Sequence, residues 1–242
     1  MRITTHGEYL VQLTRYTAFN CFLVRESDGF TLIDTGLKDS GQAIVQAARD
    51  LGAPIRRILL THAHLDHVAS LDELHGLLPD AEVAISARDA RFLRGDNSLD
   101  AEEPQVPLRG GYVVCSTQPM RLLGAGDRIG SLEVIASPGH TPGHIAFFDH
   151  RDRTLIAGDA YSTKAGISTG GTLRVLFPFP AMATWHKPTS IHSAEVLCSL
   201  QPARLAVGHG RTLEQPAAAM EQAIAEAKRR VGREAHSVQK AY

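Results

Sequence analysis

The chain has 242 residues and a formal net charge of −1 at pH 7, with 25 Lys and Arg against 26 Asp and Glu. Since the basic residues do not cluster, the sequence lacks the footprint of a nucleic-acid-binding protein. No apolar run reaches the roughly 18 residues that a transmembrane helix needs, so we expect no membrane association. The length suits one domain with a sizeable core, and we expect residues 1–242 to form a single domain.

Three cysteines, Cys21, Cys115 and Cys198, stand far apart in the sequence. An odd number of isolated thiols argues against a disulfide framework and favours a reducing compartment. The first residues lack the long apolar stretch of a secretory signal peptide. We therefore expect a cytoplasmic protein.

Short apolar runs alternate with helical patterns along the whole chain, as in α/β proteins. Turn-forming residues at 27–29 join the first two strands, and Gly52 and Pro54 end the first helix. The expected strands lie at 19–24, 30–33, 58–60, 82–85, 132–136, 145–148, 154–157 and 204–207. The expected helices lie at 40–51, 68–78, 86–94, 191–200 and 216–230.

Two long segments, 95–119 and 162–189, show no regular pattern and are expected as loop insertions. Long loops in a compact domain are usually functional, so we expect them to form the substrate walls. The second segment is rich in apolar and aromatic residues, including the only tryptophan, Trp185. It would cover an apolar part of the substrate, plug the sandwich edge or form a homodimer contact.

A weak internal repeat relates the two halves of the chain. Residues 31–36 resemble residues 154–159, and residues 57–62 resemble residues 204–209. In each half an apolar strand is followed, after a helix, by a second strand that ends in histidine. The repeat predicts two similar α/β halves that face each other, with a site where their strand ends meet.

The segment 61–67, Thr-His-Ala-His-Leu-Asp-His, holds three imidazoles and a carboxylate. It lies between an expected strand and an expected helix. His62 and His64 are two residues apart, so on extended backbone their side chains point the same way. Asp66 and His67 lie past the bend and can point toward a second position. Four side chains of ligand type around one turn predict a site for two metal ions.

Three further side chains of ligand type follow expected strands. His140 lies in a tight loop of glycines and prolines directly after strand 132–136. Asp159 ends another strand, and its two oxygens can bridge two cations. His209 is flanked by glycines, which allow the backbone to pass close to a site. His144 opens the next strand, and we expect it to be a buried supporting histidine.

The order and combination of these motifs resemble the metallo-β-lactamase superfamily over nearly the whole chain. The resemblance is closest to its dinuclear branch, which includes lactonases and glyoxalase II. The matching motifs are Asn-Cys-Phe-Leu-Val at 20–24, Leu-Ile-Asp-Thr-Gly at 32–36, the histidine motif at 62–67, Pro-Gly-His-Thr-Pro-Gly-His at 138–144, Gly-Asp at 158–159 and Gly-His at 208–209.

The resemblance implies a four-layer αβ/βα sandwich with the site at one edge. It implies that Asp159 bridges two metal ions and that Asp34 supports the histidine loop. The first ion would be bound by His62, His64 and His140, and the second by Asp66, His67 and His209.

Histidine and carboxylate ligands without thiolate suit Zn²⁺, and also Mn²⁺ or Fe²⁺. We expect two divalent ions, most simply Zn²⁺, roughly 3.5–4 Å apart, with a bridging water whose pKa falls toward ~7. The resulting hydroxide would attack a carbonyl or phosphoryl centre. Asp66 and Tyr161 are candidates for proton transfer to the leaving group, although Tyr161 is equally a packing residue. His186 is a weaker candidate at the mouth of the site.

The sequence thus predicts a metallo-hydrolase for a small-molecule ester, lactone or thioester. Histidine at position 64 argues against the flavodiiron branch, which has glutamate there. The main alternative is a persulfide dioxygenase-like oxidoreductase with one Fe²⁺ on His62, His64 and either Asp159 or His140. A phosphodiesterase is a further alternative, for which Lys164, Arg174 and Lys187 would supply cationic groups. A non-catalytic metal-binding module is disfavoured by the full ligand set.

Overall fold

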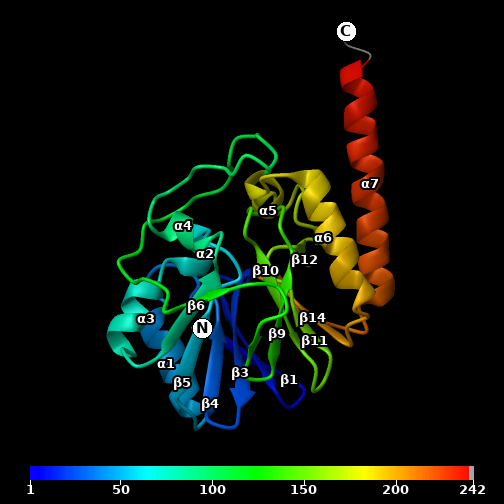
Figure 1. Ribbon diagram of the computed structural model, residues 1–242. Helices are drawn as coiled ribbons and strands as arrows, with labels where there is room; N and C mark the ends of the chain where they lie inside the picture. The colour runs from blue at the N-terminus through cyan, green and yellow to red at the C-terminus, as the bar shows by residue number, and fades with distance from the viewer. Residues whose placement is uncertain (240–242) are drawn as a thin grey trace.

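Two β-sheets pack face to face at the centre of the molecule, and helices cover the outer face of each (Figure 1). The computed structural model describes residues 1–239, with side chains described through residue 233. This arrangement is the expected four-layer αβ/βα sandwich. Among the described residues, no helix combines the length and the apolar character needed to cross a membrane.

The first sheet has seven strands in chain order. The first four form an antiparallel meander, and the last four run parallel to one another. The strands are β1 (Arg2–His6), β2 (Leu10–Arg15), β3 (Phe19–Glu26), β4 (Gly29–Ile33), β5 (Ile55–Leu59), β6 (Glu82–Ser86) and β7 (Arg121–Leu123).

The second sheet has six strands in the order β15-β14-β11-β10-β9-β8. A separate antiparallel pair of strands, β12 with β13, follows β11 in the sequence. The strands are β8 (Arg128–Ile129), β9 (Leu132–Ala136), β10 (Ile145–Asp149), β11 (Thr154–Ile156), β12 (Tyr161–Ser162), β13 (Ser168–Thr169), β14 (Arg204–Ala206) and β15 (Leu213–Glu214).

Helices α1 and α3 cover the first sheet, while α6 and α7 lie together over the second (Figure 1). Strands β4 and β5 are parallel and joined through α1, and β11 and β14 are parallel and joined through α6. This matches the internal repeat. The helices are α1 (Gly41–Asp50), α2 (Leu65–Val68), α3 (Leu71–Leu77), α4 (Ala90–Leu93), α5 (Phe179–Ala183), α6 (Lys187–Ser199) and α7 (Ala217–Gln239).

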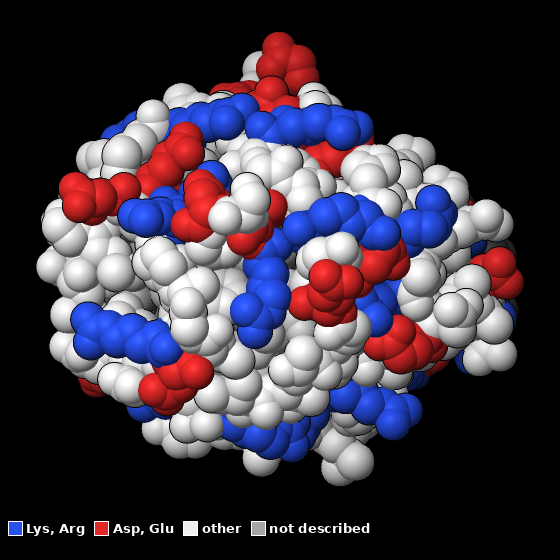
Figure 2. Space-filling view, turned by 90° about the horizontal axis from the view of Figure 1, so that it is seen from below, with Lys and Arg blue, Asp and Glu red and all other residues white. Residues whose placement is uncertain are grey.

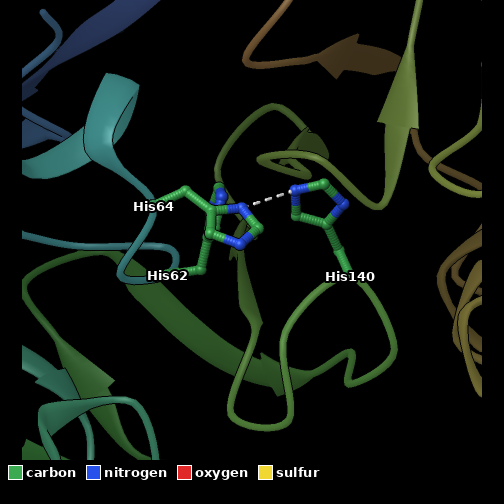
Figure 3. A group of neighbouring side chains, drawn as sticks. All are labelled: His62, His64 and His140. Carbon is green, nitrogen blue, oxygen red and sulfur yellow. Dashed lines mark hydrogen bonds between the residues drawn. The ribbon is translucent and has the colours of Figure 1, made fainter. Parts of the chain in front are cut away.

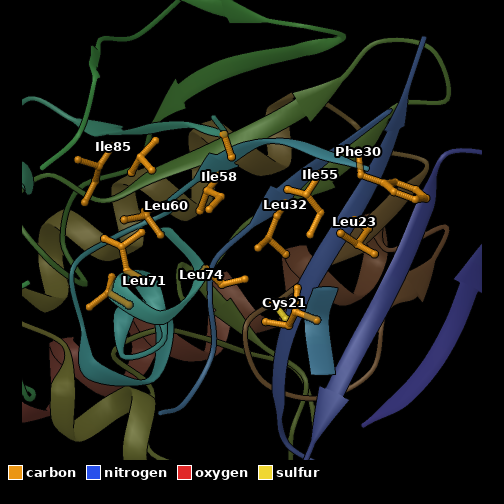
Figure 4. Packing of buried hydrophobic residues seen from close by; sticks show 14 of the residues in the cluster. Cys21, Leu23, Phe30, Leu32, Ile55, Ile58, Leu60, Leu71, Leu74 and Ile85 are labelled. Atoms are coloured by element: carbon orange, nitrogen blue, oxygen red, sulfur yellow. The ribbon is translucent and has the colours of Figure 1, made fainter. Parts of the chain in front are cut away.

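Strands β3 and β4 of the first sheet are apolar on both faces because each face meets a different core. Phe22 points between the two sheets, while its neighbours Cys21 and Leu23 point toward α1 and α3. The same alternation separates Ile33 from Leu32. Figure 4 shows the helix-facing set, with Leu32 and Leu23 among the labelled side chains. Burial on both faces explains why these strands read as continuous apolar runs.

The helix expected at 68–78 forms as two shorter helices, α2 and α3. They are separated at Ser70, whose side chain makes tertiary hydrogen bonds: it donates to the Leu37 carbonyl and accepts from the Ser40 N–H. Those bonds fix the chain at a bend, which periodicity alone does not reveal. The bend sets α2, which carries part of the histidine motif, apart from α3.

Strands β1 and β2 were not anticipated because polar residues interrupt the apolar pattern of β2. Gln12 and Thr14 are nevertheless buried, and both hydrogen-bond to Asn20 of β3. The irregular segment 162–189 also contains more structure than expected, since it holds β13, α5 and the start of α6.

Charged side chains of both signs are interspersed over the face of the molecule opposite α5 (Figure 2). This agrees with the balanced composition of the chain, 25 basic against 26 acidic residues. A face of mixed sign offers no extended field for a polyanion.

Candidate metal centre

The histidine motif follows the carboxyl end of β5, an interior strand of the first sheet. His64 directly precedes α2 and lies on extended backbone, whereas Asp66 and His67 lie within the helix. His140 approaches from the loop between β9 and β10. Figure 3 shows His62, His64 and His140 turned toward one another, with Nδ1 of His64 and Nε2 of His140 at 3.0 Å.

The structure brings together all seven side chains that the sequence proposes as ligands. Three groups have ligand atoms within 4.8 Å of one another: His62 with His64 and His140, His62 with His67 and Asp159, and Asp66 with His67 and His209. We call the first of these the three-histidine group and the last the acidic group. All seven side chains are buried except Asp66, which is half-buried.

Asp159 lies between the two groups. Its Oδ2 is 3.4 Å from Nε2 of His140 and 3.0 Å from Nε2 of His209, and its Oδ1 is 3.4 Å from Nε2 of His67. One carboxylate therefore faces ligand atoms of both groups. This is the position that a bridging ligand requires.

In the three-histidine group, each ring has one nitrogen engaged outside the centre. Nε2 of His64 donates to the Arg109 carbonyl, which leaves Nδ1 unprotonated, with a free lone pair. Nδ1 of His140 donates to the Thr184 hydroxyl, because that hydroxyl itself donates to the Pro180 carbonyl. Nδ1 of His62 faces the Thr61 hydroxyl at 3.0 Å. These partners fix the tautomers so that the remaining nitrogens face the centre.

The acidic group is oriented in the same way. Nδ1 of His67 donates to Oδ2 of Asp34 at 2.8 Å, and Nδ1 of His209 faces the Ala18 carbonyl at 3.3 Å. The Nε2 atoms of both rings then face Asp66 and Asp159. Each of the five histidines thus presents one nitrogen to a group of neighbouring ligand-type atoms.

The polar atoms at the centre fit divalent metal ions. Two lone pairs, on Nδ1 of His64 and Nε2 of His140, face each other at 3.0 Å, which is repulsive without a cation between them. Nε2 of His62, Nε2 of His67 and Oδ1 of Asp159 are buried without a hydrogen-bond partner. Buried polar atoms without partners are rare and destabilising, so these atoms indicate a ligand role.

Protonation differs between the two groups. Burial lowers the pKa of His64 to about 4 and the pKa values of His62 and His140 well below the usual value. These rings are therefore neutral at pH 7, the form that binds metal. Burial also disfavours charge on His67 and His209, but Asp34 and Asp159 raise the pKa of His67 well above its usual value. Asp159 likewise raises the pKa of His209 to about 9. Carboxylates that favour a proton here also favour a metal cation.

Asp34 supports the histidine loop, as the resemblance implies. It accepts hydrogen bonds from the Thr61 N–H at 2.8 Å, from the Thr61 hydroxyl and from His67. Its φ of +61° is unusual for a residue with a side chain. Such strain is maintained where the surrounding bonds require it, often at functional sites.

His144 supports the centre without facing it. Its Nδ1 is bonded to the Ser137 hydroxyl at 2.8 Å, and its Nε2 accepts from the N–H of Asp159 at 3.1 Å. It therefore positions the backbone of Asp159. This matches the supporting role expected from the sequence.

Asp89 is a supporting residue that the sequence reading missed. It is fully buried and accepts hydrogen bonds from the Ala63 N–H, the Thr141 hydroxyl and the Gly143 N–H at 3.0, 2.6 and 2.7 Å. These donors belong to the two loops that carry the three-histidine group. Its position after β6, next to β5 in the parallel sheet, was the available signal, since the ends of adjacent parallel strands meet at one edge.

The structure does not bring Tyr161 to the centre, which corrects its expected catalytic role. The ring is fully buried in the core between the second sheet and α6, and its hydroxyl donates to the Ala194 carbonyl at 2.7 Å. The residue lies only two positions after Asp159, but β12 turns it to the other side. His186 caps α6 by accepting from the Thr189 N–H.

Gly208 lies where a side chain would collide with the centre. A Cβ atom at this position would lie 2.3 Å from Oδ1 of Asp159 and 2.6 Å from Cε1 of His67. The backbone of the loop after β14 therefore passes directly against the Asp159 carboxylate. This confirms the close approach predicted from the glycines that flank His209.

Comparison with known proteins agrees with this geometry. The family model described as the metallo-beta-lactamase superfamily matches residues 18–209. The uncharacterized protein YobT of Bacillus subtilis is 49% identical over 95% of this chain and 100% of its own length. The probable metallo-hydrolase YflN of Bacillus subtilis is 30% identical over 78% of each chain. The hydroxyacylglutathione hydrolase GloC of Haemophilus influenzae is 28% identical over 69% of this chain and 76% of its own.

A solved structure is similar over most of its length. TTHA1623, determined in a di-iron-bound form, superposes with a TM-score of 0.63 and 27% identity, covering 88% of this chain and 97% of that chain. Sequence, fold and the geometry of the metal centre therefore lead to one conclusion. The chain belongs to the metallo-beta-lactamase superfamily and is a metallo-hydrolase of that superfamily.

Proposed function

We propose that this enzyme hydrolyses an ester, lactone or thioester of a small molecule at a centre of two divalent metal ions. The observation that carries the proposal is the shared position of Asp159 between the three-histidine group and the acidic group. One carboxylate between two sets of ligands supports a dinuclear centre over a mononuclear one.

Zn²⁺ is the simplest assignment for a set of histidine and carboxylate ligands, with Mn²⁺ and Fe²⁺ as alternatives. The di-iron-bound form of TTHA1623 supports keeping iron among them. When bound, two such ions supply a hydroxide nucleophile at neutral pH and polarise the carbonyl under attack.

The protein's own residues orient the histidine ligands and transfer a proton during the reaction. His62, His64 and His140 are neutral and oriented by fixed partners, so they keep their geometry without a change of protonation. Asp66 is the most exposed ligand-type side chain, with 26% of its side chain accessible. It faces the small cavity of about 60 Å³ at the centre. We assign to the Asp66 carboxylate the transfer of a proton from the nucleophile to the leaving group.

The small cavity, at about 60 Å³, has room for ions and water but not for a whole substrate. Its outer wall consists of Phe179, Pro180 and Ala183 of α5, together with Gly111 from the long loop. The mouth is therefore largely apolar, and Phe179 is 62% exposed there. An apolar rim supports a substrate with an acyl chain or ring. The name of GloC, a hydroxyacylglutathione hydrolase, supports hydrolysis of a thioester.

The phosphodiesterase alternative has less support. Arg174 is engaged with both oxygens of Glu226 and with the Ile167 carbonyl, and Lys164 donates to the Thr17 carbonyl. Two of the three cations that the sequence offered are thus bonded elsewhere, and neither lines the cavity at the centre.

The proposal is tested by assaying hydrolysis of matched aryl ester, thioester and lactone substrates. The metal-free protein is reloaded with Zn²⁺, Mn²⁺ or Fe²⁺, and bis-p-nitrophenyl phosphate serves as the phosphodiester control. We expect acyl hydrolysis that is lost on chelation and restored by metal. Faster cleavage of the phosphodiester than of every acyl substrate would contradict the proposal. Oxygen uptake with glutathione persulfide and one iron per chain would identify the dioxygenase alternative.

A further inference from the structure

The long loop between α4 and β7 runs along one metal ligand, His64. The Arg109 carbonyl accepts from Nε2 of His64 at 3.0 Å. The Gly111 carbonyl accepts from the N–H of Leu65, the next residue of the histidine motif, at 2.8 Å. Tyr112 then pairs with His64 through an isolated β-bridge. The loop therefore contacts both the backbone and the ring of a residue that the metal centre requires.

The Arg109 carbonyl determines which atom of the His64 ring faces the centre. An imidazole that turns by half a turn about its Cβ–Cγ bond exchanges Nδ1 with Cδ2, so the same residue can present a nitrogen or a carbon. The hydrogen bond from Nε2 to the Arg109 carbonyl holds the ring with Nδ1 pointing toward His140 (Figure 3). The same bond keeps the proton on Nε2 and leaves Nδ1 available for a cation.

Gly110 is the residue that allows this carbonyl to come so close. A Cβ atom at its position would lie 2.4 Å from Nε2 of His64 and 2.7 Å from Cε1, and its φ of +84° lies in the left-handed region. The His64 ring is buried against the rings of two other ligands and of Tyr112, so it has no room to move aside without disturbing the centre. A side chain at position 110 would therefore displace either the loop or the ligand.

The loop is fixed before these contacts by Trp185. The Val106 carbonyl accepts from the indole N–H of Trp185 at 3.1 Å. The backbone N–H of Trp185 donates to the carbonyl of His140, a second ligand of the three-histidine group, at 3.0 Å. One loop thus has connections to ligands from both halves of the chain.

The loop is fixed after these contacts by the Tyr112 ring. Its centroid lies 4.8 Å from that of the His64 ring in an edge-to-face arrangement, and 4.5 Å from that of Phe92, which is buried in α4. The Tyr112 hydroxyl is buried and has no hydrogen-bond partner within the part of the chain that the structure describes. The ring, and not the hydroxyl, therefore makes the contact with the ligand.

We propose that Gly110 and Tyr112 are positioning residues of the three-histidine group. Gly110 allows the Arg109 carbonyl to reach His64, and the Tyr112 ring holds the imidazole in place. Both act through His64 and touch neither the substrate nor the reacting atoms. The role rests on the metal centre of the proposed function and adds that the long loop sets how tightly the three-histidine group binds its ion.

The first test measures Zn²⁺ affinity in full-length His209→Ala protein, in which the three-histidine group keeps all its ligands. Competition with a chromophoric chelator gives the Kd. We expect Gly110→Ala to raise the Kd by about 10–100-fold, the usual effect of changing an outer partner of a metal ligand. Gly126→Ala is the matched control, because its φ is also +84° but a Cβ atom there would meet nothing within 4 Å. Its Kd should equal that of the parent protein.

A pair of substitutions at Tyr112 tests the ring in the same protein. Tyr112→Ala removes the contact with His64 and is expected to raise the Kd for Zn²⁺ about threefold to tenfold. Tyr112→Phe keeps the ring and removes only the unpartnered hydroxyl, so it should restore the parent Kd to within about twofold. Equal Kd values for the two variants would contradict the role of the ring.

A spectroscopic measurement tests the orientation of His64 without metal. In metal-free protein with ¹⁵N-labelled histidine, the ring nitrogen signals of His64, assigned from a His64→Asn variant, report which nitrogen carries the proton. We expect the Nε2-protonated form in the parent and in Gly126→Ala, and a mixture of both forms in Gly110→Ala.

An unchanged proton position in Gly110→Ala would overturn the positioning role, and so would an unchanged Kd. If the parent protein bound no zinc, the metal centre of the proposed function would fail instead. The proton position alone would then decide whether the loop orients His64, so the two failures are distinguishable.

Discussion

The three-histidine group and the acidic group differ in what holds them. The rings of the first are oriented by hydroxyl and carbonyl partners, and burial keeps them neutral. In the second, carboxylates surround His67 and His209 and raise their pKa values. The first group is therefore a set of fixed, neutral ligands. The second is a site whose affinity for cations comes mainly from negative charge. Asp159 is the residue on which both depend.

The largest effect is therefore expected from Asp159→Asn, which removes the shared negative charge while keeping the shape. Both groups lose a ligand facing their histidines, so we expect loss of detectable hydrolysis and of most bound metal. Metal content and initial rates measure this. Asp80→Asn, at an exposed position, is the matched control. A dinuclear, active Asp159→Asn protein would refute the bridging role.

Variants in the separate groups distinguish how much metal each group binds. His140→Ala removes a ligand from the three-histidine group only, and His209→Ala removes one from the acidic group only. We expect each variant to keep about one metal ion per chain, since the other group retains its ligands and Asp159. Elemental analysis after dialysis measures the count. Complete loss of metal in both variants would show that the groups do not bind independently.

A smaller effect is expected from Asp89→Asn. The substitution weakens the bonds that join the loop of His62 and His64 to the loop of His140. Changes of such outer partners typically cost 10–100-fold in metal affinity or activity, and we expect a loss of about that size for the three-histidine group. Competition with a chromophoric chelator measures it in the wild type and in the His209→Ala background. An effect confined to the acidic group would contradict the role assigned to Asp89.

The smallest effect is expected from Tyr161→Phe. The change removes one buried hydrogen bond to Ala194, worth about 0.5–1.5 kcal/mol of stability. For a chain of this size, that lowers the Tm by roughly 1–6 °C. Because the hydroxyl faces away from the centre, kcat and metal content should not change. A lower kcat at unchanged Tm would restore Tyr161 to the mechanism.

The ligands were predictable because each lies in a short motif at a strand end, where local sequence fixes direction. His62 and His64, which lie between the end of β5 and the start of α2, are the clearest case. Asp89 could not be predicted in this way, because its partners Ala63 and Gly143 are joined to it only by the packing of sheets and loops. Tyr161 was misassigned for the opposite reason: nearness in sequence to Asp159 did not determine which way the side chain faces.

The elements of the fold likewise differ in how far they could be predicted from the sequence. Strands with two buried apolar faces, such as β4, were evident from their composition. Strand β2 was not, since its buried Gln12 donates hydrogen bonds to Asn20 on the neighbouring strand and to the Gly210 carbonyl, which is 198 residues away in the sequence. The bend between α2 and α3 likewise depends on contacts of Ser70 with another loop.

The most direct test of the central claim is the metal content of protein purified without added metal or an affinity tag that chelates. The shared position of Asp159 between two ligand groups predicts close to two divalent ions per chain, and a lower Tm after both are removed, because binding to the folded state stabilises it. Close to one ion per chain at saturation, with wild-type activity, would contradict the dinuclear centre.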